Sequence, residues 1–178
     1  MKTLKNVIRI FIALALIISI AHVELSEEIK MQSLKISAGG GWYNSNSFVI
    51  EITNNGYLSL ITGDGIFCAD EEDYENMYDV RRYKKIRLSS KQAQKIDELI
   101  TKTLKTKDDI KESNVMDASV VIAVFGDNTK VATDIASYDN KKNYLNVLLY
   151  EVVKASPLDQ SNPLVELINN CMKTHKGP

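Results

Sequence analysis

Histidine is scarce in this sequence: His22 and His175 are the only two, and both lie far from the middle of the chain. Serine and cysteine hydrolases need an imidazole held inside the fold beside the nucleophile, and neither position offers one. The glycine-rich motifs of nucleotide-binding loops and the nucleophile motif of α/β-hydrolases are absent as well. We therefore predict no catalytic residues and no cofactor.

Cysteine is equally scarce, with only Cys68 and Cys171. Two cysteines without an internal histidine cannot form a closed zinc site, so we expect no bound metal. In an exported protein an even number of cysteines favours a disulfide. This bond would close a loop of about 100 residues and stabilise the fold by roughly 4–5 kcal/mol in the chain-entropy model. The alternative is two buried thiols, because unpaired cysteine is among the most buried residue types.

The N-terminus lacks an apolar run of the length that a transmembrane helix needs, which is about 20 residues. Its uncharged run covers only residues 10–20, follows three basic residues and ends next to Ala21. Such a short apolar core is typical of a cleaved signal peptide. We predict a signal peptide over residues 1–21 and export to the periplasm or the cell exterior. The alternative is an uncleaved membrane anchor over residues 7–23.

The chain has no excess of positive charge, since 22 lysines and arginines stand against 23 acidic residues. Removal of the signal peptide would take away three basic residues and no acidic one, which leaves a mildly acidic domain. Nucleic-acid binding needs a strong positive field. We therefore expect no nucleic acid as partner, and no membrane contact once the signal peptide has been cleaved.

Residues 48–62 have the clearest strand pattern. Two runs of strand-forming residues flank Asn54, Asn55 and Gly56. If these three residues form the loop, the apolar side chains of both strands share one face, whereas a two-residue loop would split them. Gly56 also suits the left-handed position that ends a three-residue loop. The predicted cross-strand pairs are Ile52 with Leu58, Ile50 with Leu60 and Phe48 with Thr62.

A second hairpin is predicted over residues 118–135, with Asp127 and Asn128 as a two-residue turn. The predicted pairs are Val124 with Val131, Ile122 with Thr133 and Val120 with Ile135. Residues 80–88 are rich in lysine and arginine on both faces of the predicted strand, and this density of charge is typical of an edge strand protected against pairing with other chains. Residues 31–38 alternate weakly and predict a further edge strand.

Three helices complete the pattern. The first begins after Ser89, whose spacing to Gln92 fits a capping box. Residues 140–155 carry a broad apolar stripe at helical spacing. The last helix begins with Asn162 as its cap and Pro163 at the first helical position.

These elements predict an α+β fold: a single antiparallel β-sheet built from two hairpins plus the basic edge strand, with about three helices packed on one face. The domain is expected over residues 31–173, between a flexible lead-in (22–30) and a C-terminal tail (174–178). Its segments YLSLITGDG and LSSKQ resemble those of small exported bacterial domains of unknown function. This resemblance implies no site residues.

Three segments are candidates for partner binding. The first carries an aromatic pair after three glycines, and aromatic side chains recur at the centres of interfaces; packing back over the sheet is the alternative. The second is the acidic segment 70–79, which lacks the spacing of a calcium loop and is otherwise a solvated loop. The third is the basic strand. The candidate residues are Trp42, Tyr43, Glu71, Glu72, Asp73, Arg81, Tyr83 and Lys85. Asp64, between two glycines, is interpreted as part of a turn.

An acidic segment beside a basic strand offers charge complementarity, which speeds the encounter of two proteins. We therefore predict an exported, non-enzymatic binding domain, such as an inhibitor, an immunity-type protein or an envelope interaction protein. Its partner is expected to be another protein. The alternative is an envelope enzyme that uses a bound metal or a pair of carboxylates, because such pairs form across space.

Overall fold

The computed structural model describes residues 29–39, 46–64, 78–82, 85–110, 119–135 and 143–174. The predicted signal peptide, anchor and most of the lead-in lie outside these ranges. So do Trp42, Tyr43, Cys68, Tyr83 and the acidic residues Glu71, Glu72 and Asp73. None of the helices within these ranges is long and apolar enough to cross a membrane.

One antiparallel sheet forms the centre of the structure, with the strand order β4-β3-β2-β1-β6-β7 and β5 paired to β3. The strands are β1 (Leu34–Gly39), β2 (Ser47–Ile52), β3 (Tyr57–Asp64), β4 (Tyr78–Arg82), β5 (Ile86–Arg87), β6 (Val120–Phe125) and β7 (Lys130–Asp134). The helices are α2 (Ser90–Lys105), the short 3-10 helix η2 (Lys107–Asp109), α3 (Tyr144–Ala155) and α4 (Pro163–Thr174).

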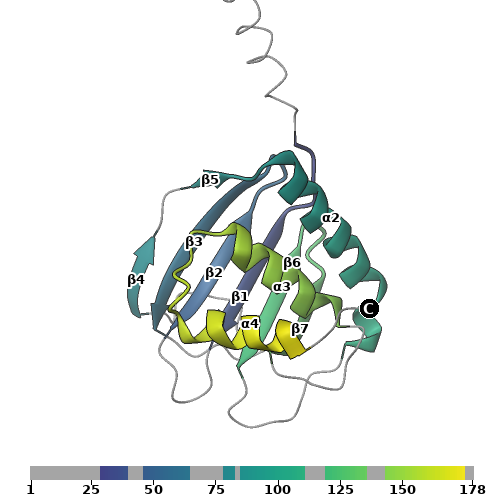
Figure 1. The fold of residues 1–178 in the computed structure, drawn as a ribbon. Coiled ribbons are helices and arrows are strands. Elements are labelled where there is room, and N and C mark those ends of the chain that lie inside the picture. The colour runs from purple at the N-terminus through teal and green to yellow at the C-terminus, as the bar shows by residue number, and fades with distance from the viewer. Residues whose placement is uncertain are drawn as a thin grey trace, which may run out of the picture.

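Helices α2, α3 and α4 lie together over one face of the sheet (Figure 1). Alternate strand residues such as Ile36, Ile50 and Leu60 pack against helix residues such as Ile100 and Leu149 in one large core. These side chains are at most 1% exposed. Burial of a whole sheet face under a helix layer is what an α+β fold requires, and the predicted fold class is confirmed.

The first hairpin has the predicted register. Ile52 pairs with Leu58, Ile50 with Leu60 and Phe48 with Thr62. The loop is closed by two backbone hydrogen bonds, from Thr53 N–H to the Tyr57 carbonyl (2.9 Å) and from Gly56 N–H to the Thr53 carbonyl (2.9 Å). Gly56 has φ = 77°, the left-handed conformation that the three-residue loop needs.

The predicted register of the second hairpin is wrong by one residue. The observed pairs are Val124 with Lys130, Ala123 with Val131, Ile122 with Ala132, Val121 with Thr133 and Val120 with Asp134. The loop contains three residues, Gly126 to Asn128, and Asn128 takes the left-handed conformation at φ = 64°. As a result Ala123 faces the helix layer, whereas Ile122 packs with Val49 on the opposite face.

The strand predicted over residues 31–38 is not an edge strand. β1 lies in the middle of the sheet, between β2 and β6. Five of its six residues are buried, and only Lys35 is partly exposed. Both hairpins pair with β1, one on each side, and this long-range pairing gave no signal in the local sequence.

The predicted basic strand is present at the edge but is divided into two. β4 pairs with β3 near Thr62, and β5 pairs with β3 near Tyr57. Ile86 packs against the core as expected. Val80, however, is 40% exposed and does not face the core, because its neighbour Arg81 pairs with Thr62 on the core side of β3 and successive side chains of a strand point to opposite faces.

The local signals for the helix ends are confirmed. Ser89 and Gln92 form both hydrogen bonds of a capping box at the start of α2. Helix α3 begins four residues later than predicted, after Asn143, whose side chain accepts a hydrogen bond from Asn146 N–H. Pro163 opens α4, as its fixed φ favours.

Candidate functional site: a polar groove beside the β3–β4 edge

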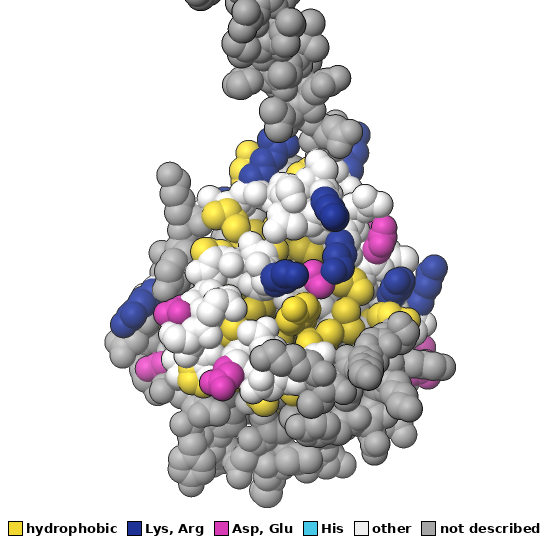
Figure 2. Space-filling model, in the orientation of Figure 1, with side chains coloured by type: hydrophobic (Ala, Val, Ile, Leu, Met, Phe, Trp, Pro, Cys, Tyr) yellow, Lys and Arg dark blue, Asp and Glu magenta, His cyan; other side chains and the backbone are white. Residues whose placement is uncertain are grey.

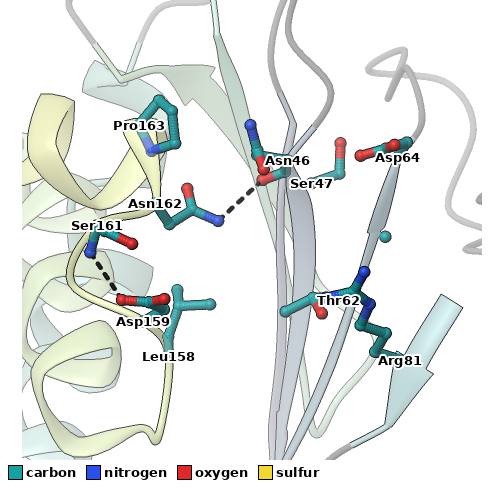
Figure 3. Close-up of a pocket in the computed structure, with 11 residues that line it drawn as sticks. Asn46, Ser47, Thr62, Asp64, Arg81, Leu158, Asp159, Ser161, Asn162 and Pro163 are labelled. Atoms are coloured by element: carbon teal, nitrogen blue, oxygen red, sulfur yellow. Dashed lines mark hydrogen bonds between the residues drawn. The ribbon is translucent and has the colours of Figure 1, made fainter. Parts of the chain in front are cut away.

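A groove of about 370 Å³ lies between the β3–β4 edge of the sheet and the segment that connects α3 to α4 (Figure 3). One wall consists of Asn46, Ser47, Thr62, Gly63, Asp64 and Arg81, and the other of Leu158, Asp159, Ser161, Asn162 and Pro163. Except for Leu158, Gly63 and Pro163, these residues have polar or charged side chains. The groove is therefore suited to polar and charged groups rather than to an apolar ligand.

The sheet positions the first wall. Thr62 pairs with Phe48 on one side and with Arg81 on the other. Cross-strand partners point to the same face of a sheet, and Phe48 belongs to the core under the helices. Thr62 and Arg81 therefore project toward the helix layer. The register of β3 and β4 shifts next to them, and Asp64, on the far side of this shift, also lines the groove.

The cap of α4 positions the second wall. Asn162 Oδ1 accepts a hydrogen bond from Leu164 N–H (2.9 Å). Asn162 Nδ2 donates across the groove to the Asn46 carbonyl (3.4 Å), as the dashed line in Figure 3 shows. The same side chain thus caps the N-terminal end of α4 and links the two walls.

Asp159 provides the negative charge of the second wall. Its Oδ1 accepts a hydrogen bond from Ser161 N–H (2.9 Å), and the hydrogen bonds from Ser161 lower the pKa of Asp159 below its usual value. A carboxyl that acts as a general acid needs a raised pKa instead. Asp159 is therefore suited to bind a positive group. Its pKa is shifted downward, whereas a carboxyl that serves as the acid of an enzyme needs an upward shift.

Charges of both signs line this groove. Figure 3 shows Arg81 and Asp64 on the sheet wall and Asp159 on the helix wall. Among the described side chains, none forms an ion pair with any of these three groups. No group of three acidic, histidine or cysteine side chains that could hold a metal occurs in the same part of the chain.

The structure separates two of the predicted partner-binding residues. Arg81 lines the groove. Lys85 is exposed and directly precedes β5, which pairs at the other end of β3. The predicted disulfide stays a prediction: Cys171 is buried in the core, where burial raises its pKa, and Cys68 is not among the described residues.

Sequence reasoning missed most of the groove. Asp64 was interpreted as a turn residue and Asn162 only as a helix cap, and neither Thr62 nor Asp159 was a candidate. Asp159 and Ser161 do have a local signal, because Asp often accepts a hydrogen bond from the backbone two residues later. That signal predicts a turn and contains no information about the strands that lie opposite.

A second group of buried polar side chains lies where α3 meets β7. Asn143 Nδ2 donates to Thr133 Oγ1 (3.1 Å), and Asn146 Nδ2 donates to the Asp134 carbonyl (3.4 Å). These bonds attach the start of α3 to the edge strand. We assign them a structural role.

Comparison with known proteins gives no guide to the groove. No family model matches this sequence, and no curated protein or solved structure matches it significantly.

Proposed function

We propose that this protein is an exported binding domain that recognises another protein, and that the groove between the β3–β4 edge and the α3–α4 connection is part of its recognition surface. The observation that carries this proposal is the presence of opposite charges on facing walls: Arg81, with Asp64 on the same wall, and Asp159 on the other, none of them in an ion pair with another described side chain. Complementary charges on a partner would satisfy both groups, and such complementarity determines register and speeds association.

A hydrogen bond between the two walls also supports recognition. It joins Asn162 to the Asn46 carbonyl, and these two residues are 116 positions apart in the sequence. A site that is already ordered before binding loses less entropy when its partner arrives. The charged groups are therefore presented on a fixed frame.

Two other candidate segments adjoin residues of the groove in the sequence. Tyr43 precedes the groove residue Asn46 by three positions. The acidic segment connects Asp64 to Tyr78, and these two residues are paired across β3 and β4. Trp42, Tyr43, Glu71, Glu72 and Asp73 are thus proposed to extend the same recognition surface.

Charge reversal of Arg81 tests the proposal. We expect Arg81→Glu to weaken capture of the native partner by about tenfold or more, because a like charge would then face the partner's acidic group. Arg87→Glu is the matched control: Arg87 is also on the basic edge, but it pairs with Tyr57, about 17 Å along β3 from Thr62. The measurement is quantitative pull-down from the native host at two salt concentrations.

Equal capture by the two variants would exclude the groove from the recognition surface. The acidic segment is tested separately by reversing Glu71, Glu72 and Asp73 together. If partner affinity and its dependence on salt were then unchanged, this segment would play no part in binding.

A further inference from the structure

We infer that the groove takes a small zwitterionic ligand, namely a short peptide or amino acid that carries a free carboxylate and a free ammonium group. This inference rests on the proposed role of the groove as a recognition site and specifies the chemistry that the site accepts.

The positive side of the groove suits a carboxylate. The guanidinium of Arg81 presents several N–H donors in a planar fork that matches the two oxygens of a carboxylate. Arg81 is exposed and lines the groove beside Thr62, its cross-strand neighbour. The hydroxyl of Thr62 is a further donor on the same face of the sheet.

The negative side of the groove suits an ammonium group. Ser161 N–H occupies one oxygen of Asp159, and an ionised carboxylate has acceptor capacity for several hydrogen bonds. An aspartate carboxylate is ionised at neutral pH, and the hydrogen bonds from Ser161 lower the pKa of Asp159 further. Asp64 also lines the groove and adds a second negative group.

The combination of charges decides between ligand classes. A simple anion attracted to Arg81 would also meet Asp64 and Asp159, and a simple cation would meet Arg81. Like charges brought together in a partly enclosed site destabilise binding. Only a ligand with both charges gains on both walls. The volume of about 370 Å³ lies at the small end of the range for small-molecule sites.

The test uses triglycine and two analogues that each lack one of its charged ends. N-acetyl-triglycine has no ammonium group, and triglycine amide has no carboxylate. We expect triglycine to bind to the purified protein with millimolar affinity. Loss of either charged end should weaken binding by about fivefold, the size expected for one partly exposed ion pair. Binding is measured by chemical-shift titration at low ionic strength.

Two conservative variants then assign each charge to a wall. In Arg81→Gln, triglycine and its amide should bind equally, while the acetylated probe should still bind more weakly. In Asp159→Asn the opposite pattern is expected, and the asparagine oxygen can still accept the hydrogen bond from Ser161. Arg87→Gln should behave like the unmodified protein.

The inference would be overturned if triglycine failed to bind at tens of millimolar, or if all three probes bound equally. It would also be overturned if both groove variants weakened all three probes to the same extent, since this would indicate a purely structural effect. None of these outcomes would affect the proposed function, which depends on Arg81→Glu and the native partner.

Discussion

The two hairpins of this protein have the same loop, yet only one register was evident from the sequence. In each hairpin the residue before the loop donates its N–H to the carbonyl of the residue after it: Thr53 to Tyr57, and Phe125 to Thr129. In each, the third loop residue is left-handed, Gly56 in one and Asn128 in the other. The backbone solution is therefore the same, and the difference lies in the side chains of the strands.

In the first hairpin, Glu51 and Ser59 lie opposite each other on the face away from the helices, so a slip of one residue would move polar Glu51 into the core although Val49 on that face is apolar and buried. Strand β6 is apolar on both faces. Val121 and Ala123 face the helices, while Ile122 packs with Val49 and Ala132 on the other side. A slip of β6 exchanges one apolar set for another, so alternation alone cannot decide its register. The register of a strand can therefore be predicted from the sequence only where its two faces differ in polarity.

The largest effect is expected from placing a charge on each face of β6. Ala123 is fully buried under the helix layer, so Ala123→Asp should lower the free energy of unfolding by about 4 kcal/mol or prevent folding, because it buries an unpaired charge. Val124 is partly exposed and lies opposite Lys35 and Lys130. Val124→Asp should therefore change the free energy of unfolding by less than about 1 kcal/mol. The measurement is urea denaturation.

The register predicted from sequence would require the reverse order, with Val124→Asp the more damaging change. A clearly larger loss of stability in Val124→Asp than in Ala123→Asp would thus contradict the observed pairing of β6 with β7.

An exchange of the left-handed residues tests the equivalence of the two loops. A Cβ at Gly56 would lie 2.8 Å from Ile29 Cγ2, so Gly56→Asn should cost about 1–3 kcal/mol although asparagine tolerates this conformation. Asn128→Gly has the same backbone requirement, and it should change stability by no more than about 1 kcal/mol. Both are measured as free energies of unfolding.

Ile29→Ala supplies the control for this exchange. In the Ile29→Ala background the cost of Gly56→Asn should shrink, because the crowding atom has been removed. An unchanged cost would mean that backbone strain rather than the contact with Ile29 makes glycine necessary.

The smallest effect concerns the middle residue of each loop, Asn55 in the first and Asp127 in the second. The backbone N–H of Thr129 donates to Asp127 Oδ1 (2.9 Å) and lowers the pKa of this carboxyl. A lowered pKa contributes stability above the unfolded-state value, and this contribution is lost as pH falls through the folded-state value. Wild type should therefore be slightly more stable than Asp127→Asn near pH 6, and the difference should shrink as the pH falls below the ordinary pKa of an aspartate.

Thermal unfolding of both proteins across this pH range measures the difference. A difference that stays constant or grows toward acid pH would show that the Asp127 carboxylate does not stabilise the second loop. The first loop has no titrating group at Asn55, so Asn55→Asp should introduce a pH dependence there only if the carboxylate finds a similar donor.

Local signals were sufficient for the parts of the fold that depend on neighbours in sequence. The Ser89–Gln92 capping box, Asn162 with Pro163, and Gly56 each specify their conformation within a few residues. The position of β1 is different, since its weak alternation predicted an edge. Its pairing with β6 depends on residues almost 90 positions away, which no local pattern reports.

The sequence by itself determined the α+β class, the first hairpin with its register, and the caps of the helices, because these follow from side-chain period and from hydrogen bonds between close neighbours. Only the tertiary structure decided the register of β6, the central place of β1 and the groove that joins Arg81 to Asp159 and Asn162. Those features arise from pairings between distant segments whose local patterns are compatible with more than one partner.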